Sequence, residues 1–243
     1  MVEFDALEED VEQKWMHCQP IDFLLSIGGD GTLLSSVRLI GSSGIPVVGV
    51  NFGHLGFLTT VGQGGMSQFV ADLLAERYTI EERTLLRVDN ATKPHFALNE
   101  VTLYRKEEVS LLRTNLYVDD EFVATYDGDG LIVATPTGST AYSLSCGGPI
   151  LTPNSGCFVI TPIGAHTLTL RPMIVPDSAK IRLEPVADQR GFYMATDSTS
   201  VLVSGSPQIR LAKENFSIRL VRMHKQSFFT AIHEKLAWGT GLR

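Results

Sequence analysis

Three short stretches of the chain carry residue types that could do chemistry. The first, Gly28-Gly29-Asp30-Gly31-Thr32, places a carboxylate among glycines, after an apolar run and before a helical pattern. Glycines let a ligand approach the backbone, and the N-terminus of the following helix attracts anions through its free N–H groups. Because a carboxylate repels a phosphate, Asp30 is expected to accept a proton or to meet a metal, or else merely to cap the helix. This stretch alone leaves these alternatives open.

The second stretch runs from Thr135 to Ile150 and follows Asp127-Gly128-Asp129-Gly130 and a short apolar run. The pattern predicts a strand, a turn rich in hydroxyl groups, and a short helix with Ser139 or Thr140 near its start. The hydroxyl groups and the ring of Tyr142 would suit a sugar, a base or a phosphate. The alternative is a well-capped helix whose Tyr142 packs in the core.

The third stretch is the adjacent pair Asn99-Glu100 within an otherwise apolar strand, residues 97–105. Neighbouring residues of a strand point to opposite faces, and unsatisfied polar groups in an apolar layer are unfavourable. The pair is therefore expected at a strand end or in a site. The sequence has no Gly-Lys-Ser/Thr phosphate loop, no complete GxGxxG or GxSxG motif, and no zinc-ligand spacing among its histidines and cysteines. We predict no protein-bound metal site.

Composition narrows the class of protein. The chain has 243 residues, 44% of them hydrophobic, and a net charge of −7, which argues against general binding of nucleic acid or of anionic membranes. Three cysteines without paired spacing fit reduced thiols, and no apolar run approaches the ~20 residues that span a bilayer. The acidic N-terminus does not resemble a signal peptide. We expect a cytoplasmic protein that binds neither nucleic acid nor membrane.

The elements that must position these residues change in kind along the chain. Apolar runs at 21–25 and 45–51 alternate with a helix from 33 to 40 and a helix capped by Ser67, as in a doubly wound α/β layer. Later segments read mostly as strands, with a hairpin turn at Asp119-Asp120, a helical island at 138–145 and a final helix at 228–238. The predicted strands are 79–89, 97–105, 111–118, 121–126, 130–135, 158–163, 168–175, 179–186, 191–196 and 216–223.

These patterns predict two domains. Residues 1–90 form an α/β domain, onto which 228–243 packs back, and residues 91–227 form an antiparallel, β-sandwich-like domain. The α/β domain reads as incomplete, because such domains usually begin with a strand and a turn whereas residues 3–16 read as an acidic helix. A first strand is expected to be missing, and Asn90–Pro94 could conceal a second omission.

Together the three stretches resemble the motifs of the NAD kinase family, which are a GGDGT turn, an Asn-Glu pair and a TPTGSTAYSLSxGGPI segment, in this order. Here they stand as Gly28–Thr32, Asn99-Glu100 and Thr135–Ile150, and the resemblance spans roughly residues 20–240. It implies transfer of the γ-phosphoryl group of ATP to the 2′-hydroxyl of the adenosine ribose of NAD. By the same likeness Asp30 is the general base, which accepts the proton late in a loose transition state.

The resemblance also implies the remaining site residues. Mg²⁺ or another divalent cation would accompany ATP, and Gly164 and His166 would lie where a neighbouring subunit completes the pocket of a homodimer or homotetramer. Asp127 departs from the family, in which several members carry a basic residue. The implied phosphate-binding positions are Gly28, Gly29, Gly31 and Thr32. The implied NAD-binding positions are Asp30, Gly31, Phe57, Asn99, Glu100, Asp129, Thr140, Ala141, Tyr142, Ser143, Leu144, Ser145, Gly164 and His166.

Two other functions remain as alternatives at this point. The GGDGT turn is shared with kinases that act on lipids or sugars, and a catalytically silent dinucleotide-binding regulator would keep the same binding motifs. The sequence leaves open ATP or polyphosphate as donor, NADH as acceptor, feedback by NADP(H) and the number of subunits.

Overall fold

A computed structural model of the chain describes residues 21–51, 56–59, 66–89, 95–106, 111–186, 191–223 and 227–238. The helix expected at 3–16, most of the glycine-rich loop after Phe52, and the segment 90–94 lie outside these residues. The described residues form two compact units, one built from residues 84–216 and the other from residues 21–83 together with those after 216. We call them the β-rich unit and the α/β unit.

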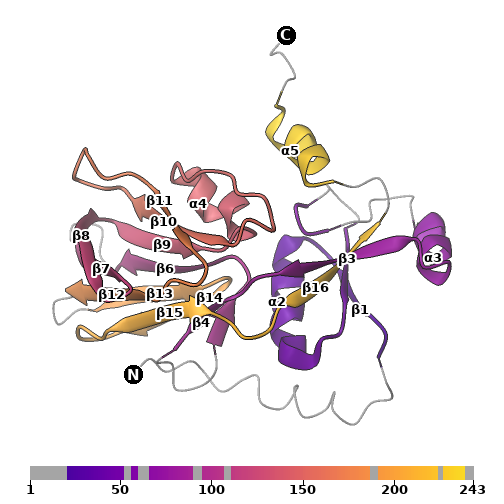
Figure 1. The fold of residues 1–243 in the computed structure, drawn as a ribbon, viewed down its shortest axis with the longest axis horizontal. Coiled ribbons are helices and arrows are strands. Elements are labelled where there is room, and N and C mark those ends of the chain that lie inside the picture. Colours follow the sequence, from indigo (N-terminus) through magenta and orange to yellow (C-terminus); the bar gives the residue numbers. More distant parts are fainter. Residues whose placement is uncertain are drawn as a thin grey trace. The chain divides into compact units, whose positions relative to one another are not determined.

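The α/β unit is a four-stranded sheet with the strand order β1-β2-β16-β3 (Figure 1). Strand β2 is parallel to β1 and to β16, whereas β3 is antiparallel to β16. The strands are β1 Leu24–Ile27, β2 Val47–Val50, β3 Tyr78–Arg83 and β16 Ile218–Met223. The helices are α2 Asp30–Ile40, the 3-10 turn η1 Gly41–Ser43, α3 Met66–Leu74 and α5 Phe228–Leu236.

Helix α2 follows β1 directly and packs against the sheet through one apolar side. Leu33 and Val37 lie one turn apart on it and are fully buried, as the helical period requires for a core-facing side. Strand β2 is buried along its whole length. A Cβ atom at Gly49 would lie 2.9 Å from both the Leu33 side chain and the backbone of Thr59. Glycine at this position therefore lets α2 and the segment 56–59 approach β2 closely.

The β-rich unit consists of two six-stranded sheets with the orders β11-β10-β9-β6-β13-β14 and β5-β4-β15-β12-β7-β8. All of their strand pairs are antiparallel. The first sheet contains β6 Glu100–Arg105, β9 Gly130–Ala134, β10 Cys157–Ile163, β11 Met173–Pro176, β13 Phe192–Thr196 and β14 Thr199–Val203. The second contains β4 Leu86–Val88, β5 His95–Ala97, β7 Leu112–Val118, β8 Glu121–Gly128, β12 Ile181–Val186 and β15 Ile209–Lys213.

The main core lies between these two sheets. Buried side chains of β6 and β9 join those of β7, β12 and β15 in one apolar cluster, as in a β-sandwich. The fold class predicted from the sequence, an α/β layer followed by an antiparallel sandwich, is thus confirmed. The Asp119-Asp120 turn is confirmed as well, with φ values of +51° and +65°, which are those of a primed hairpin turn.

Several local predictions were wrong. Residues 79–89 form two strands, β3 and β4, that belong to different sheets, and residues 168–172 precede β11 rather than forming part of it. Strands β14 and β15 were missed. Ser67 lies inside α3, which already begins at Met66. None of the described helices is long and apolar enough to cross a membrane.

Candidate active site

The Gly28–Thr32 turn connects β1 to α2, as predicted. Gly29 is the N-cap residue of α2, and in the described part of the chain no side chain caps this helix. Asp30 is the first helical residue, so the capping alternative is wrong. Gly28 has φ +153°, and a Cβ atom there would lie 2.3 Å from Oγ1 of Thr32, so the turn needs glycine at this position.

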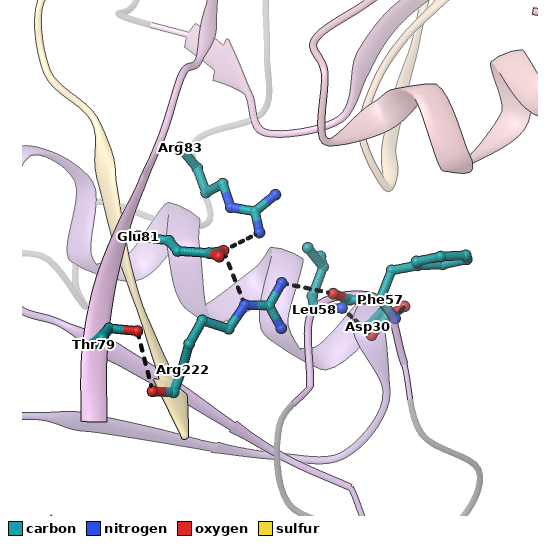
Figure 2. A network of polar contacts seen from close by, with 7 residues as sticks. All are labelled: Asp30, Phe57, Leu58, Thr79, Glu81, Arg83 and Arg222. Atoms are coloured by element: carbon teal, nitrogen blue, oxygen red, sulfur yellow. Dashed lines mark hydrogen bonds and ion pairs between the residues drawn. The ribbon is translucent and has the colours of Figure 1, made fainter. Parts of the chain in front are cut away.

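The carboxylate of Asp30 is held by the short segment 56–59 (Figure 2). Its Oδ2 accepts the N–H of Phe57 at 3.0 Å, and its Oδ1 accepts the N–H of Leu58 at 3.3 Å. The ammonium of Lys235 on α5 lies 3.7 Å from Oδ2 and 4.7 Å from the centre of the Phe57 ring. A Cβ atom at Gly56 would lie 1.8 Å from Oδ1. This segment therefore fixes the direction of the carboxylate while the side chain stays 32% exposed.

Two arginines and a glutamate support the same segment. Nη2 of Arg222 on β16 donates to the carbonyl of Phe57 at 2.9 Å, and its Nε donates to Oε2 of Glu81 on β3 at 3.0 Å. Arg83 donates to the same oxygen at 2.5 Å. Burial acts to raise the pKa of Glu81, but the two guanidinium groups outweigh it and hold this pKa below its usual value. Burial, helped by the charge of Arg222, lowers the pKa of Arg83 to about 10.

Gly29 and Gly31, unlike Gly28, are not required to be glycine by the backbone conformation or by close contacts. A Cβ atom at either position would meet no described atom within 4 Å, and neither residue has a positive φ. The packing around them thus does not account for glycine. The two positions leave open space beside the N-terminus of α2, and anions approach helix N-termini most closely where side chains are missing.

A second group of predicted residues lines a cavity of about 560 Å³ in the β-rich unit. Tyr142 is 46% exposed and lines this cavity, so the alternative that it packs in the core is wrong. Glu100 and Asp129, both predicted, lie on the same cavity. The remaining lining residues are Thr102, Tyr104, Arg105, Lys106, Ile163, Ala195 and Asp197.

Glu100 begins strand β6, and Asn99 directly precedes it, so the pair lies at a strand end as predicted. In the described part of the chain, Oε2 of Glu100 is buried without a hydrogen-bond partner. Burial and the negative charge of Asp197 raise the pKa of Glu100 to about 8, although the backbone N–H of Tyr142 acts in the opposite direction. The cavity is thus lined by a carboxyl group that is only partly ionised near neutral pH and whose Oε2 is buried.

Asp197 was missed by the sequence reasoning. It lies in the tight turn between β13 and β14 with φ +50°. Its Oδ2 accepts the N–H of Leu98 at 2.8 Å, and its Oδ1 accepts the N–H groups of Asn99 at 2.8 Å and Glu100 at 3.1 Å. Asp197 therefore fixes the backbone that carries the Asn-Glu pair. An aspartate in a turn is a local signal, but nothing in the sequence connects it to residues about a hundred positions away.

The hydroxyl-rich stretch is joined to the Asn-Glu pair through the backbone. The N–H of Thr135 donates to the carbonyl of Asn99 at 2.8 Å, and a Cβ atom at Gly138 would lie 2.1 Å from that same oxygen. The predicted helical island is a 3-10 turn, η2 Gly138–Thr140, followed by the short helix α4 Tyr142–Ser145. The hydroxyl of Ser143, a predicted NAD contact, is buried and hydrogen-bonded to Thr161 at 2.8 Å, and the hydroxyls of Thr135 and Ser139 are likewise buried and bonded within the chain.

Asp129 forms an ion pair with Arg105, with 2.7 Å between Oδ1 and Nε. A Cβ atom at Gly164 would lie 2.6 Å from the other oxygen of Asp129, and Gly164 has φ +53°. The backbone N–H of His166 donates to the carbonyl of Asp127 at 2.9 Å. The structure thus places Gly164 and His166 beside the Asp127–Gly130 stretch. Within the described residues, no three histidine, cysteine, aspartate or glutamate side chains form a cluster that could hold a metal ion.

Two family profiles match the chain. Residues 8–78 match the profile of the ATP-NAD kinase N-terminal domain, and residues 98–223 match that of the ATP-NAD kinase C-terminal domain. An NAD kinase from Porphyromonas gingivalis is 43% identical over 225 residues, which cover 92% of this chain and 78% of the relative.

Two solved structures are similar as well. Yeast NADH kinase complexed with NADH superposes with a TM-score of 0.85 at 28% identity, covering 96% of this chain and 71% of the yeast chain. An NAD kinase from Archaeoglobus fulgidus in complex with ATP gives a TM-score of 0.79 at 26% identity, covering 96% and 87%.

Proposed function

The chain belongs to the NAD kinase family and is a phosphotransferase that converts NAD to NADP, and from this premise we propose that Asp30 is its general base. The carboxylate accepts the proton of the 2′-hydroxyl of the adenosine ribose as that oxygen attacks the γ-phosphorus of ATP. The bond to the β-γ bridging oxygen breaks in the same step, and ADP leaves with the electron pair.

The observation that supports this role is the way in which Asp30 is held. Two backbone N–H groups orient its oxygens, one each, while about a third of the side chain stays exposed. Each carboxylate oxygen can accept more than one hydrogen bond, so capacity remains for the hydroxyl of a substrate. A base held in one orientation contributes through positioning, and general-base catalysis typically adds roughly 10²–10⁴-fold to the rate.

ATP phosphates are proposed to lie on the backbone of Gly28–Thr32. The open space at Gly29 and Gly31 and the N-terminus of α2 fit an anion, and the ammonium of Lys235 supplies a positive charge beside Asp30. Mg²⁺ or another divalent cation entering with ATP would supply further neutralisation of the charge that develops there. The ATP complex of the Archaeoglobus fulgidus relative supports ATP as donor.

NAD is proposed to occupy the cavity of the β-rich unit. The carboxyl group of Glu100 on the cavity wall suits a ribose hydroxyl, and the exposed ring of Tyr142 offers an apolar face to the dinucleotide. The NADH complex of the yeast relative supports a dinucleotide ligand. The other proposed NAD contacts are those that the family likeness implies: Asp30, Gly31, Phe57, Asn99, Asp129, Thr140, Ala141, Leu144, Ser145, Gly164 and His166.

We further propose that the protein acts in the cytoplasm as a homodimer or homotetramer. The reason is the family likeness, which puts Gly164 and His166 where a second subunit completes the pocket. Sedimentation velocity of the full chain tests this assembly, because a monomer at assay concentration would contradict it.

The role of Asp30 is tested by measuring NADP formation from NAD, ATP and Mg²⁺ with the variant Asp30→Asn. We expect kcat to fall by roughly 10²–10⁴-fold, while NAD binding, followed by calorimetry, stays within a few-fold of the parent. Asp22→Asn is the matched control, because Asp22 is an exposed carboxylate of the same unit, and it should keep full activity. An Asp30→Asn protein with undiminished kcat would remove Asp30 from this role.

A further inference from the structure

Resting on the proposed role of Asp30, we propose that Arg222 is a positioning residue for phosphoryl transfer. It acts through Phe57: by holding the carbonyl of this residue, it fixes the N–H that orients the Asp30 carboxylate. The elements involved all belong to the α/β unit (Figure 2).

The peptide groups on either side of Phe57 are held in two directions. Towards the site, its N–H donates to Oδ2 of Asp30 at 3.0 Å; away from the site, its C=O accepts from Nη2 of Arg222 at 2.9 Å. The segment is short, and its other internal contact is the N–H of Gly56 donating to Oγ1 of the buried Thr59 at 2.7 Å. Loss of the Arg222 contact therefore removes a hydrogen bond that fixes the peptide groups whose N–H groups orient Asp30.

Arg222 is itself held rigidly. Its side chain is only 11% exposed, and its Nε donates to Oε2 of Glu81, the oxygen that also accepts from the buried Arg83. Strands β3 and β16 are paired antiparallel, with Thr79 opposite Arg222 and Glu81 opposite Leu220, so these side chains come from adjacent strands. A guanidinium is planar with its donors in a fixed fork, so one group can bridge Glu81 and the Phe57 carbonyl with defined geometry.

The charges of the cluster formed by Glu81, Arg83 and Arg222 support a role in function. Two guanidinium groups meet on one carboxylate in a mostly buried place. Buried ion pairs are often no more stabilising than apolar residues of the same size, so stability alone does not explain the cluster. A fixed guanidinium behind the segment that orients Asp30 does explain it, because this group holds the carbonyl of Phe57.

The expected effect is on kcat rather than on substrate affinity. A displacement of about 1 Å in a positioned catalytic group can reduce the rate on the order of 10²-fold. Arg222→Met should reduce kcat by roughly 10–100-fold, whereas KM for NAD and for ATP should change by less than about threefold. Arg222→Lys keeps the charge and one donor, so it should recover part of the loss.

The matched control is Arg219→Met on the same strand. Its guanidinium also donates to a backbone carbonyl, that of Gly44 at 3.2 Å, but it does not contact the segment 56–59 in the described structure. This variant should keep kcat within about twofold of the parent. If Arg222→Met does not fold, as judged by circular dichroism, Arg222→Lys carries the same comparison.

A double-mutant cycle with Asp30→Asn decides whether Arg222 acts through Asp30. If it does, adding the Arg222 variant to Asp30→Asn should reduce the remaining rate by less than about twofold, measured as single-turnover transfer of labelled phosphate. The inference would be overturned if the rate losses of the two single variants multiplied in the double variant. It would also be overturned if both Arg222→Lys and Arg222→Met had the parental kcat. Either result would leave Asp30 as the base. An active Asp30→Asn protein would instead refute the proposed function on which the inference rests.

Discussion

Glu100 should make the stability of the β-rich unit depend on pH. Its pKa is about 8 in the folded chain against an ordinary value of 4.5, because burial and Asp197 disfavour the charged form. Between these two values the folded chain keeps a proton that the unfolded chain has released, so stability falls as pH rises. Below about 4.5 both states are protonated and Glu100 has no effect; above about 8 its destabilising effect is complete.

The size of the effect follows from the two pKa values. At about 1.36 kcal/mol per pKa unit, the difference between 4.5 and about 8 corresponds to roughly 5 kcal/mol. This is an upper limit, because Glu100 lines an open cavity in which water screens the charge. We expect roughly 2 kcal/mol in practice, which for a chain of this size corresponds to a melting temperature about 4–8 °C lower at pH 9 than at pH 5 from this group alone.

Glu100→Gln isolates this contribution, because the amide is neutral at every pH and can donate to the carboxylate of Asp197. Thermal unfolding of parent and variant should give equal melting temperatures near pH 5 and a variant that is several degrees more stable at pH 9. The control is Glu121→Gln, which changes an exposed carboxylate of the same unit. A difference between Glu100→Gln and parent that stays constant with pH, or that shrinks as pH rises, would refute this reasoning.

Three further substitutions test separate parts of the site. Gly56→Ala places a Cβ atom where Oδ1 of Asp30 lies, so kcat should fall by roughly 10²-fold; normal initial rates would show that the direction of this carboxylate does not matter. Lys235→Met should raise KM for ATP by roughly tenfold and Lys235→Arg should restore it, whereas unchanged ATP saturation would exclude contact with phosphates. Asp197→Asn should raise KM for NAD by roughly fivefold and move the pKa of Glu100 toward its usual value, which NAD titration from pH 6 to 9 would detect.

The residues that carry local chemistry were predictable from the sequence. Asp30 among its glycines, the Asn99-Glu100 pair at a strand end and the exposed Tyr142 are each specified by a few neighbouring residues and lie where those patterns indicated. Patterns of this kind depend on the period of strands and helices and on turn chemistry, which act over short distances.

The supporting contacts were not predictable, because they join distant parts of the chain. Asp197 binds the N–H groups of residues 98–100, and Arg222 binds the carbonyl of Phe57. In both pairs the two partners are far apart in the sequence, so no local pattern indicates the contact. The split of residues 79–89 into β3 and β4 has a similar cause. No glycine or proline separates Arg83 from Leu86, so the sequence has no turn signal where the chain passes from one sheet to another.

The connection from β3 to β4, where the chain passes from one sheet to the other, has a consequence for folding. Arg83 pairs with Ile218 at the end of β3 and β16, while the N–H of Glu214 donates to the carbonyl of Leu85 at 3.0 Å. The β-rich unit is thus an insertion whose two ends are held next to each other. Before the inserted unit has folded, pairing β3 with β16 requires closing a loop of roughly 130 residues, which costs chain entropy. Once the inserted unit has folded it brings those ends together, so its folding favours assembly of the sheet that carries Arg222 and supports Asp30.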